Sequence, residues 1–254
     1  MRVNHVAADG VPMQEMISRL ERTWGVADDV VYPTPEAFGP HMGPRSCVGR
    51  DGLCEMQAFI DFSPLLAWRK KVNATLPEPI TVSAALMWCI ARQPALRETF
   101  LGTTVDVPAD DCAGRGVGMV VIRPGDYINR DNGLAEYVRA FGRELALTRT
   151  RRSGGAKTLD ACALMSPSIA STLLKYAANH DPRAFGTLGL TILKDAKVFG
   201  APLGDAGHPD GFIAIGSMAL PTGDGRKIGC VCIKGPRERI QNYPQIIQQA
   251  INQI

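Results

Sequence analysis

The 254-residue sequence lacks any stretch close to the roughly 18 to 20 consecutive apolar residues that a membrane-spanning helix needs. Its first residues, MRVNHVAADGVPMQEM, contain no apolar run of the kind found in a secretion signal, so we expect a cytoplasmic protein without a membrane partner. The sequence also lacks a large excess of charge of one sign. It contains 28 Lys and Arg and 25 Asp and Glu, which gives a net charge of +3. That excess is too weak to predict nucleic acid as a partner.

The cysteines do not form a pattern of disulfide or zinc-binding type. There are seven, an odd number, and no two are spaced as Cys-x-x-Cys or clustered with histidines. We therefore expect reduced thiols and no metal site. Cys230 and Cys232 lie two apart in a predicted strand, which puts both thiols on one face. They are expected to be small buried residues, and the alternative is a reactive thiol pair.

What the sequence contains is typical of one folded α/β domain. Apolar residues make up 45% of the chain, enough for a substantial core. We predict a single domain over residues 1–254, with an N-terminal helix and an extended arm in 1–53 and a core with a mixed β-sheet in 54–254. The predicted strands are 54–62, 117–123, 186–193, 211–218 and 227–234, with a turn at Pro124-Gly125-Asp126. The predicted helices include 11–24, one with Ser63 as its N-cap and Pro64 at its first position, one capped by Thr81 with a single buried stripe, 134–145, 158–178 and 244–253.

Four phrases of the sequence, in order, carry a family resemblance: CEMQAFIDFSPLLAWRKKVNATLPEPITVSAALMWCIARQPALRETF, RGVGMVVIRPGD, FGTLGLTILKDAKVFG and GHPDGFIAIGSM. The first contains the pattern Asp-x-x-x-Leu-x-x-x-Arg at Asp61, Leu65 and Arg69, followed by Thr81 and Pro94. Residues 54–254 thereby resemble the catalytic domain of the dihydrolipoyl acyltransferases of 2-oxo acid dehydrogenase complexes, which shares its fold with chloramphenicol acetyltransferase.

The resemblance implies a two-layer sandwich with a large mixed β-sheet, assembled as a homotrimer with the active site in a channel between subunits. It implies transfer of an acyl group to a small molecule. Acyl-CoA or an acyl-carrier protein would serve as co-substrate, and no cofactor would be bound permanently. In the family a histidine near the C-terminus takes the proton of the acceptor, and a serine donates a hydrogen bond to the oxyanion.

Neither residue is present at the matching place. A gapless alignment of the last strand and helix puts Arg237 where the family has its histidine, and a guanidinium does not act as a base near neutral pH. The serine position falls on Ile192, or on Leu193 if the register shifts by one. Thr191 is the nearest hydroxyl, but alternation along a strand turns it to the face opposite Ile192.

His208 is the best candidate for a replacement base, because it precedes a strand that borders the substrate channel in the family. We expect structural or exposed roles for His5, His41 and His180, and His180 is expected to satisfy a helix end. Two carboxylates flank His208, Asp205 and Asp210, and either could orient the imidazole. Arg237 and Arg239 are candidates for binding an anion, and the alternative is a solvated turn.

The candidate catalytic residues are thus His208, Thr191 and Arg237. We expect a stand-alone acyltransferase-like enzyme of secondary metabolism, because no lipoyl or subunit-binding domain precedes residue 54. One alternative is an inactive structural or binding homologue. The other is the same cavity adapted to cyclisation, elimination or hydrolysis.

Overall fold

The structure is a computed structural model of the whole chain. The residues that it describes are 42–45, 53–108, 115–154, 157, 169, 176, 180–193, 208–216, 218 and 220–254. The predicted helix 11–24, most of the predicted arm and nearly all of the predicted helix 158–178 lie outside these residues. Within the described part of the chain, no helix is both long and apolar enough to cross a membrane.

A mixed sheet forms the centre of the molecule, with the strand order β1-β2-β8-β6-β5-β3-β4 and the short β7 paired to β8. Strand β5 runs parallel to both β3 and β6, and the other neighbours are antiparallel. This confirms the predicted α/β class with a large mixed sheet. The strands are β1 (Met42–Arg45), β2 (Leu53–Asp61), β3 (Leu101–Pro108), β4 (Arg115–Ile122), β5 (Leu188–Ile192), β6 (Gly211–Ile215), β7 (Leu220–Pro221) and β8 (Lys227–Pro236).

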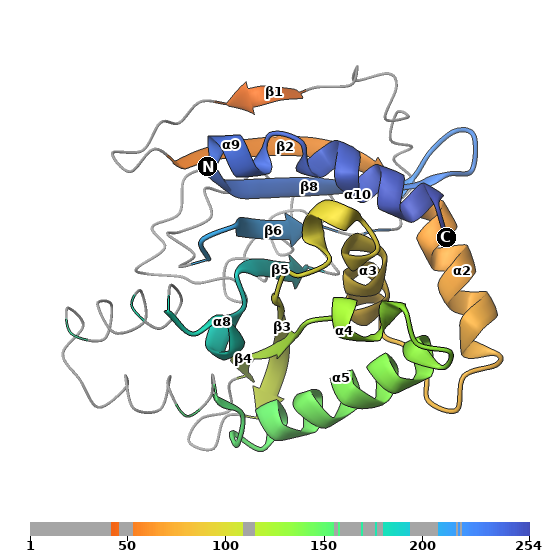
Figure 1. Cartoon of the computed structure of the whole chain (residues 1–254). Coiled ribbons are helices and arrows are strands. Elements are labelled where there is room, and N and C mark those ends of the chain that lie inside the picture. Colours follow the sequence, from red (N-terminus) through yellow and green to blue (C-terminus); the bar gives the residue numbers. More distant parts are fainter. Residues whose placement is uncertain are drawn as a thin grey trace.

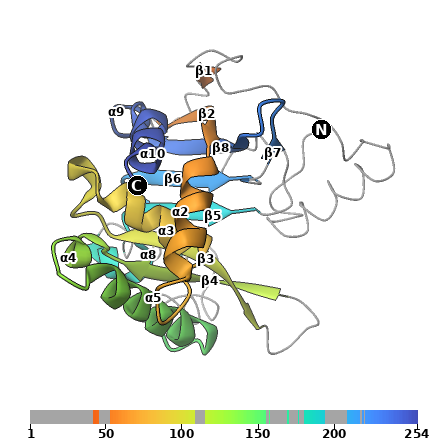
Figure 2. The same cartoon turned by 90° about the vertical axis from the view of Figure 1, so that its right-hand side faces the viewer.

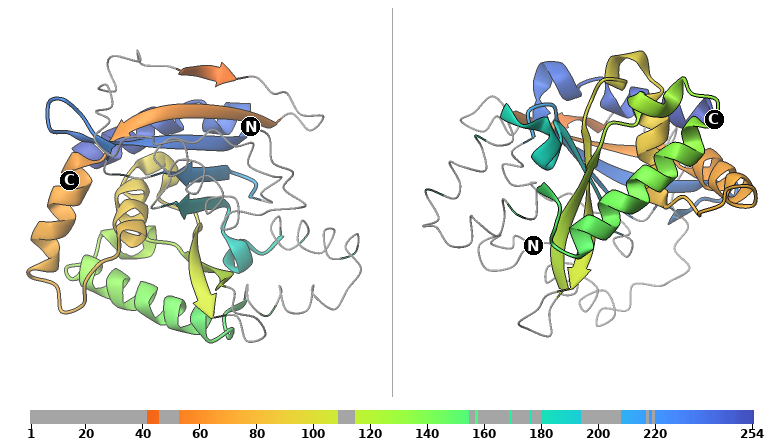
Figure 3. Two further views of the ribbon diagram at one scale, coloured as in Figure 1. Left: turned by 180° about the vertical axis from the view of Figure 1, so that it is seen from behind. Right: turned by 60° about the horizontal axis from the view of Figure 1, so that its bottom comes forward.

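Helices pack against one face of this sheet (Figure 1). Figure 2 shows α9, α10, α4 and α5 on the same side of the strands, and Figure 3 shows the sheet from behind. The helices are α2 (Ser63–Asn73), α3 (Val82–Ala91), η2 (Pro94–Leu96), α4 (Gly125–Ile128), α5 (Gly133–Arg149), α8 (Pro182–Phe185), α9 (Arg237–Ile240) and α10 (Tyr243–Asn252).

Alternation along β5 defines the two faces of the sheet. Leu188 and Leu190 point into the core beneath the helices, together with Ile213 and Ile215 of β6. Gly189 and Thr191 therefore belong to the opposite face. We call this opposite face, at β5 and its neighbours β3 and β6, the far face.

The residues that carry the family resemblance have structural roles. The Leu65 side chain is fully buried in the core. Arg69 donates from Nε to the carbonyl oxygen of Ile80 at 2.8 Å, which joins α2 to the start of α3. The hydroxyl of Thr81 accepts from the Ala84 N–H at 3.2 Å, so the predicted helix cap is confirmed. These three positions, Leu65, Arg69 and Thr81, build the framework of the fold.

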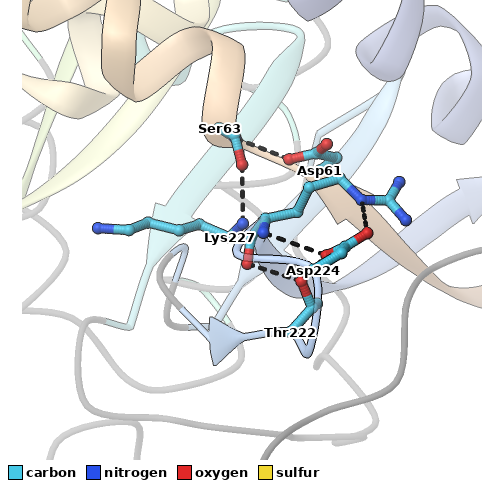
Figure 4. A network of polar contacts seen from close by, with 6 residues as sticks. Asp61, Ser63, Thr222, Asp224 and Lys227 are labelled. Carbon is cyan, nitrogen blue, oxygen red and sulfur yellow. Dashed lines mark hydrogen bonds and ion pairs between the residues drawn. The ribbon is translucent and has the colours of Figure 1, made fainter.

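The start of α2 differs from the prediction. Ser63 is the first residue of the helix rather than its cap, and its N–H donates to Asp61 Oδ1 at 2.8 Å. The Ser63 hydroxyl accepts instead from the Lys227 N–H at 2.7 Å (Figure 4). In the adjoining turn, hydrogen bonds from Thr222 and then from Arg226 lower the pKa of Asp224 to about 2. This polar network ties the turn before β8 to the start of α2.

Three further elements depart from the sequence-based prediction. Strand β3 was not predicted, since it combines Gly102, Thr103 and Thr104 and its apolar pattern is weak. Helix α4 replaces the turn predicted after β4. Helix α3 was expected to bury one stripe, but Ala84 through Ala91 are all buried, because α3 lies between the sheet and other helices.

Removing the cap of α3 should destabilise the fold. We expect Thr81→Ala to lower the free energy of unfolding by about 1 kcal/mol, because the Ala84 N–H loses its acceptor. Thr81→Ser should retain most of that stability. Urea unfolding measures the difference, with Thr99→Ala as the control, since the Thr99 hydroxyl bonds to no described residue. An equal loss in both alanine variants would contradict the role of the cap.

Candidate active site on the far face of the sheet

His208 lies directly above Gly189 on the far face. A Cβ built on Gly189 would lie 2.6 Å from His208 Nε2 and would also overlap the Phe212 ring. The imidazole and the Phe212 ring are neighbours, with ring centroids 5.4 Å apart at 33°. The missing side chain at Gly189 therefore makes the space in which the imidazole rests.

One hydrogen bond fixes the orientation and the tautomer of His208. Its Nδ1 lies 3.1 Å from the carbonyl oxygen of Gly186. A carbonyl oxygen only accepts, so Nδ1 carries the proton and Nε2 is left with a lone pair. Gly186 itself has φ +81°, and a Cβ there would lie 2.7 Å from the Gly102 N atom, so only glycine fits this turn.

Burial favours the neutral form of this imidazole. Desolvation lowers the pKa of His208 below 6.5, and the hydrogen bond to the Gly186 carbonyl opposes that shift only in part. The ring is consequently neutral at pH 7, which is the form that can accept a proton.

Thr191 shares the far face with Gly189, two residues along the same strand. Its hydroxyl lies 2.6 Å from the hydroxyl of Thr104 on β3. Ile192 packs against the core under the helices, so the predicted opposite orientation of Thr191 and Ile192 is confirmed. A side chain at position 192 has no access to the far face, whereas Thr191 has.

Arg237 lies apart from these residues. It opens α9 and is exposed, and its charge acts on Cys54, where it partly offsets the rise in pKa that burial causes. None of its described contacts is to His208 or Thr191. The structure therefore places His208 and Thr191 on one face of the sheet, with His208 over Gly189 two positions from Thr191, and leaves Arg237 outside that face.

Asp210, one of the two carboxylates that could have oriented His208, has a different partner. The Asp210 carboxylate accepts from Arg239 Nη1 at 2.9 Å, so it orients a guanidinium rather than the imidazole. The acceptor that orients His208 is a backbone carbonyl, which no side-chain pattern reveals. The predicted anion-binding role of Arg239 also weakens, because its charge already has a carboxylate partner. Asp205 lies outside the described residues.

The other histidines do not compete for the role of base in the described part of the chain. His180 stacks on Tyr176 with ring centroids 4.0 Å apart, and its Nδ1 lies 2.9 Å from the Tyr176 carbonyl oxygen. This confirms the expectation that His180 satisfies a helix end. His5 and His41 lie outside the described residues.

Buried cysteines are not the nucleophiles of this site. Cys230 and Cys232 are both buried on one face of β8, as expected. The Cys232 thiol lies 3.2 Å from Glu55 Oε1 and donates to it, and burial followed by the Glu55 charge raises its pKa. Burial likewise raises the pKa of Cys89 to about 12. Thiols in this state remain protonated and unreactive.

Comparison with known proteins gives the following relations. No protein-family model matches the sequence, and no curated protein does. Among solved structures, the chain is similar to a probable dihydrolipoamide acetyltransferase from Listeria monocytogenes (12% identity, 80% of this chain and 85% of that chain, TM-score 0.48). It is also similar to the Azotobacter vinelandii dihydrolipoamide acetyltransferase (13%, 100% and 94%, TM-score 0.48) and to a chloramphenicol acetyltransferase (8%, 80% and 87%, TM-score 0.46). These are the two kinds of protein that the sequence resembles.

A side chain at position 189 should displace the imidazole. We expect Gly189→Ala to lower the free energy of unfolding by roughly 1 to 3 kcal/mol, because its Cβ overlaps both His208 and Phe212. Gly142→Ala is the matched control, since the space around Gly142 in α5 admits a Cβ and alanine favours helix. Chemical denaturation compares the two variants. If Gly189→Ala proves as stable as wild type, the packing described here is wrong.

The lowered pKa of His208 should make stability depend on pH. The unfolded chain, with a pKa near 6.5, binds more protons than the folded chain as the pH drops from 6.5 towards the lower folded value. The free energy of unfolding should therefore fall over that interval by more in wild type than in His208→Gln. Urea unfolding at successive pH values between 8 and 5 (chosen as about the span of imidazole titration) measures the difference. A parallel pH dependence in both proteins would contradict the burial of the imidazole.

Proposed function

We propose that this protein is an acyltransferase-like enzyme that uses His208 as its general base. The observation that carries the proposal is the His208 ring itself, held by the Gly186 carbonyl through Nδ1 with Nε2 left unprotonated on the far face. The lowered pKa keeps that nitrogen ready to take a proton at neutral pH.

Thr191 supplies the second group that acyl transfer requires. Its Cβ lies about 6.6 Å along the strand from the Gly189 position over which the imidazole rests. In the proposed arrangement the tetrahedral centre forms between the imidazole and the Thr191 hydroxyl. The hydroxyl would donate to the oxyanion in place of the serine that the family has at another position.

The reaction would then be a single transfer. The hydroxyl, amine or thiol of a small acceptor gives its proton to His208 Nε2, and the acceptor atom attacks the carbonyl carbon of an acyl thioester. Thr191 donates to the resulting oxyanion. When the tetrahedral centre collapses, the C–S bond breaks and the leaving thiolate takes the proton back from His208. Acyl-CoA or an acyl-carrier protein serves as the thioester, so the products are the acylated acceptor and a free thiol.

The proposal also covers the role of Arg237 and the assembly of the protein. The exposed guanidinium of Arg237 suits an anionic group of the donor better than it suits proton transfer. A homotrimer, with neighbouring subunits closing a channel over the far face, follows from the family resemblance. The proposed acceptor is a small molecule, and the proposed role is that of a stand-alone enzyme in secondary metabolism.

A non-catalytic role is the second candidate, and one specific observation favours it. The position of the family's histidine holds the exposed Arg237, and the position of its serine holds Ile192, which faces the core. A binding or structural homologue would have lost both groups in this way.

Acetyl-CoA with panels of small alcohols and amines tests the proposal through release of the CoA thiol. We expect turnover with at least one acceptor class, and a fall in kcat of roughly 100-fold or more in His208→Gln. His180→Gln is the matched control, an exposed histidine that should leave the rate unchanged. Silence across the panel, with no thermal shift on adding CoA, would favour the non-catalytic role. Full activity in His208→Gln would remove that residue from the mechanism.

A further inference from the structure

The Thr104 hydroxyl is a hydrogen-bond partner of the Thr191 hydroxyl, from a strand that the sequence patterns did not predict. Strands β3 and β5 run parallel with Thr103 opposite Leu190, so Thr104 and Thr191 are the next pair and lie on the far face. Their hydroxyl oxygens are 2.6 Å apart, a short hydrogen bond in which either atom could be the donor.

One hydroxyl proton of the pair has no acceptor among the described residues. Two hydroxyls have two protons, and the bond between them uses one. The hydroxyl that accepts in that bond keeps its own proton, and no described residue accepts it. Both hydroxyls are only partly buried, so the remaining O–H is available to a ligand on the far face.

We propose that Thr104 is a positioning residue for Thr191: the Thr104 hydroxyl donates to the Thr191 hydroxyl, which keeps its own proton and donates it toward the oxyanion. This inference rests on the proposed function. The bond between the hydroxyls fixes the direction of the remaining proton before a ligand arrives, and it polarises that O–H. A single threonine would have to restrict its own hydroxyl rotation during the reaction, which weakens an oxyanion donor.

The strands hold the pair in place. Strand β3 is paired to β4 as well as β5, and β5 is paired to β3 as well as β6, so both threonines lie on interior strands. Threonine is β-branched and restricted at χ1, which limits the positions that each hydroxyl oxygen can take. The geometry of the pair is thus a property of the sheet.

The chain contains a matched control one residue away. Thr103 lies on the same strand but on the core face, fully buried, and its hydroxyl has no hydrogen-bond partner in the described structure. Thr103→Val replaces a hydroxyl by a methyl group, as Thr104→Val does, but it leaves the far face unchanged. Any loss common to Thr103→Val and Thr104→Val reports on the fold of β3 rather than on the pair.

Steady-state kinetics of the variants with the acceptor found active test the inference. We expect Thr104→Val to lower kcat roughly tenfold with KM within about twofold of wild type, because the interaction is made in the transition state. Thr104→Ser should restore most of kcat, and Thr103→Val should match wild type. The double variant of Thr104→Val and Thr191→Val should be no slower than Thr191→Val alone, since Thr104 acts through Thr191.

Three results would overturn it. The first is an unchanged kcat in Thr104→Val while Thr191→Val is impaired. The second is an equal loss in Thr103→Val, and the third is additive losses in the double variant. Failure of the proposed function itself has a different signature, because wild type would then show no turnover with any acceptor, and the positioning role would fall with it.

Discussion

The hydrogen bond between His208 Nδ1 and the Gly186 carbonyl is the interaction on which the candidate site depends. It assigns the proton to Nδ1 and the lone pair to Nε2, and it holds the ring down on the sheet. Two glycines make the bond possible, Gly186 through its positive φ and Gly189 through its missing Cβ. The imidazole is thereby positioned by backbone atoms, without the carboxylate that often orients a histidine.

The residues that match the resembled family support the fold, and they are distinct from the candidate site residues. Leu65, Arg69 and Thr81 match the family and build the junction between α2 and α3. In the gapless alignment of the sequence, Arg237 and Ile192 fall where the resembled family has its base and its oxyanion donor. A different histidine, His208, and a different hydroxyl, that of Thr191, lie on the far face, each with a hydrogen-bond partner of its own.

Sequence patterns were sufficient wherever a local rule governs the structure. The cap at Thr81, the amphipathic helix from Tyr243 to Asn252, and the alternation of Thr191 and Ile192 follow from nearest neighbours along the chain. They failed where the partner is distant. Asp210 is two residues from His208, yet its carboxylate binds Arg239. The sequence of strand β3 is too polar to predict a strand, and β3 is stabilised by pairing with β4 and β5.

The sequence by itself determined the α/β class and the central sheet, because residue type and periodicity are local properties. Its family resemblance, rather than any local pattern, led to His208, Thr191 and Arg237 as candidates. Only the tertiary structure decided the acceptor of His208, the space over Gly189 and the neighbour of Thr191. The physical reason is that each of these contacts joins separate strands or turns. A sequence pattern does not show which backbone carbonyl will accept a hydrogen bond or which glycine will make room for a distant side chain, because both depend on how the strands pair.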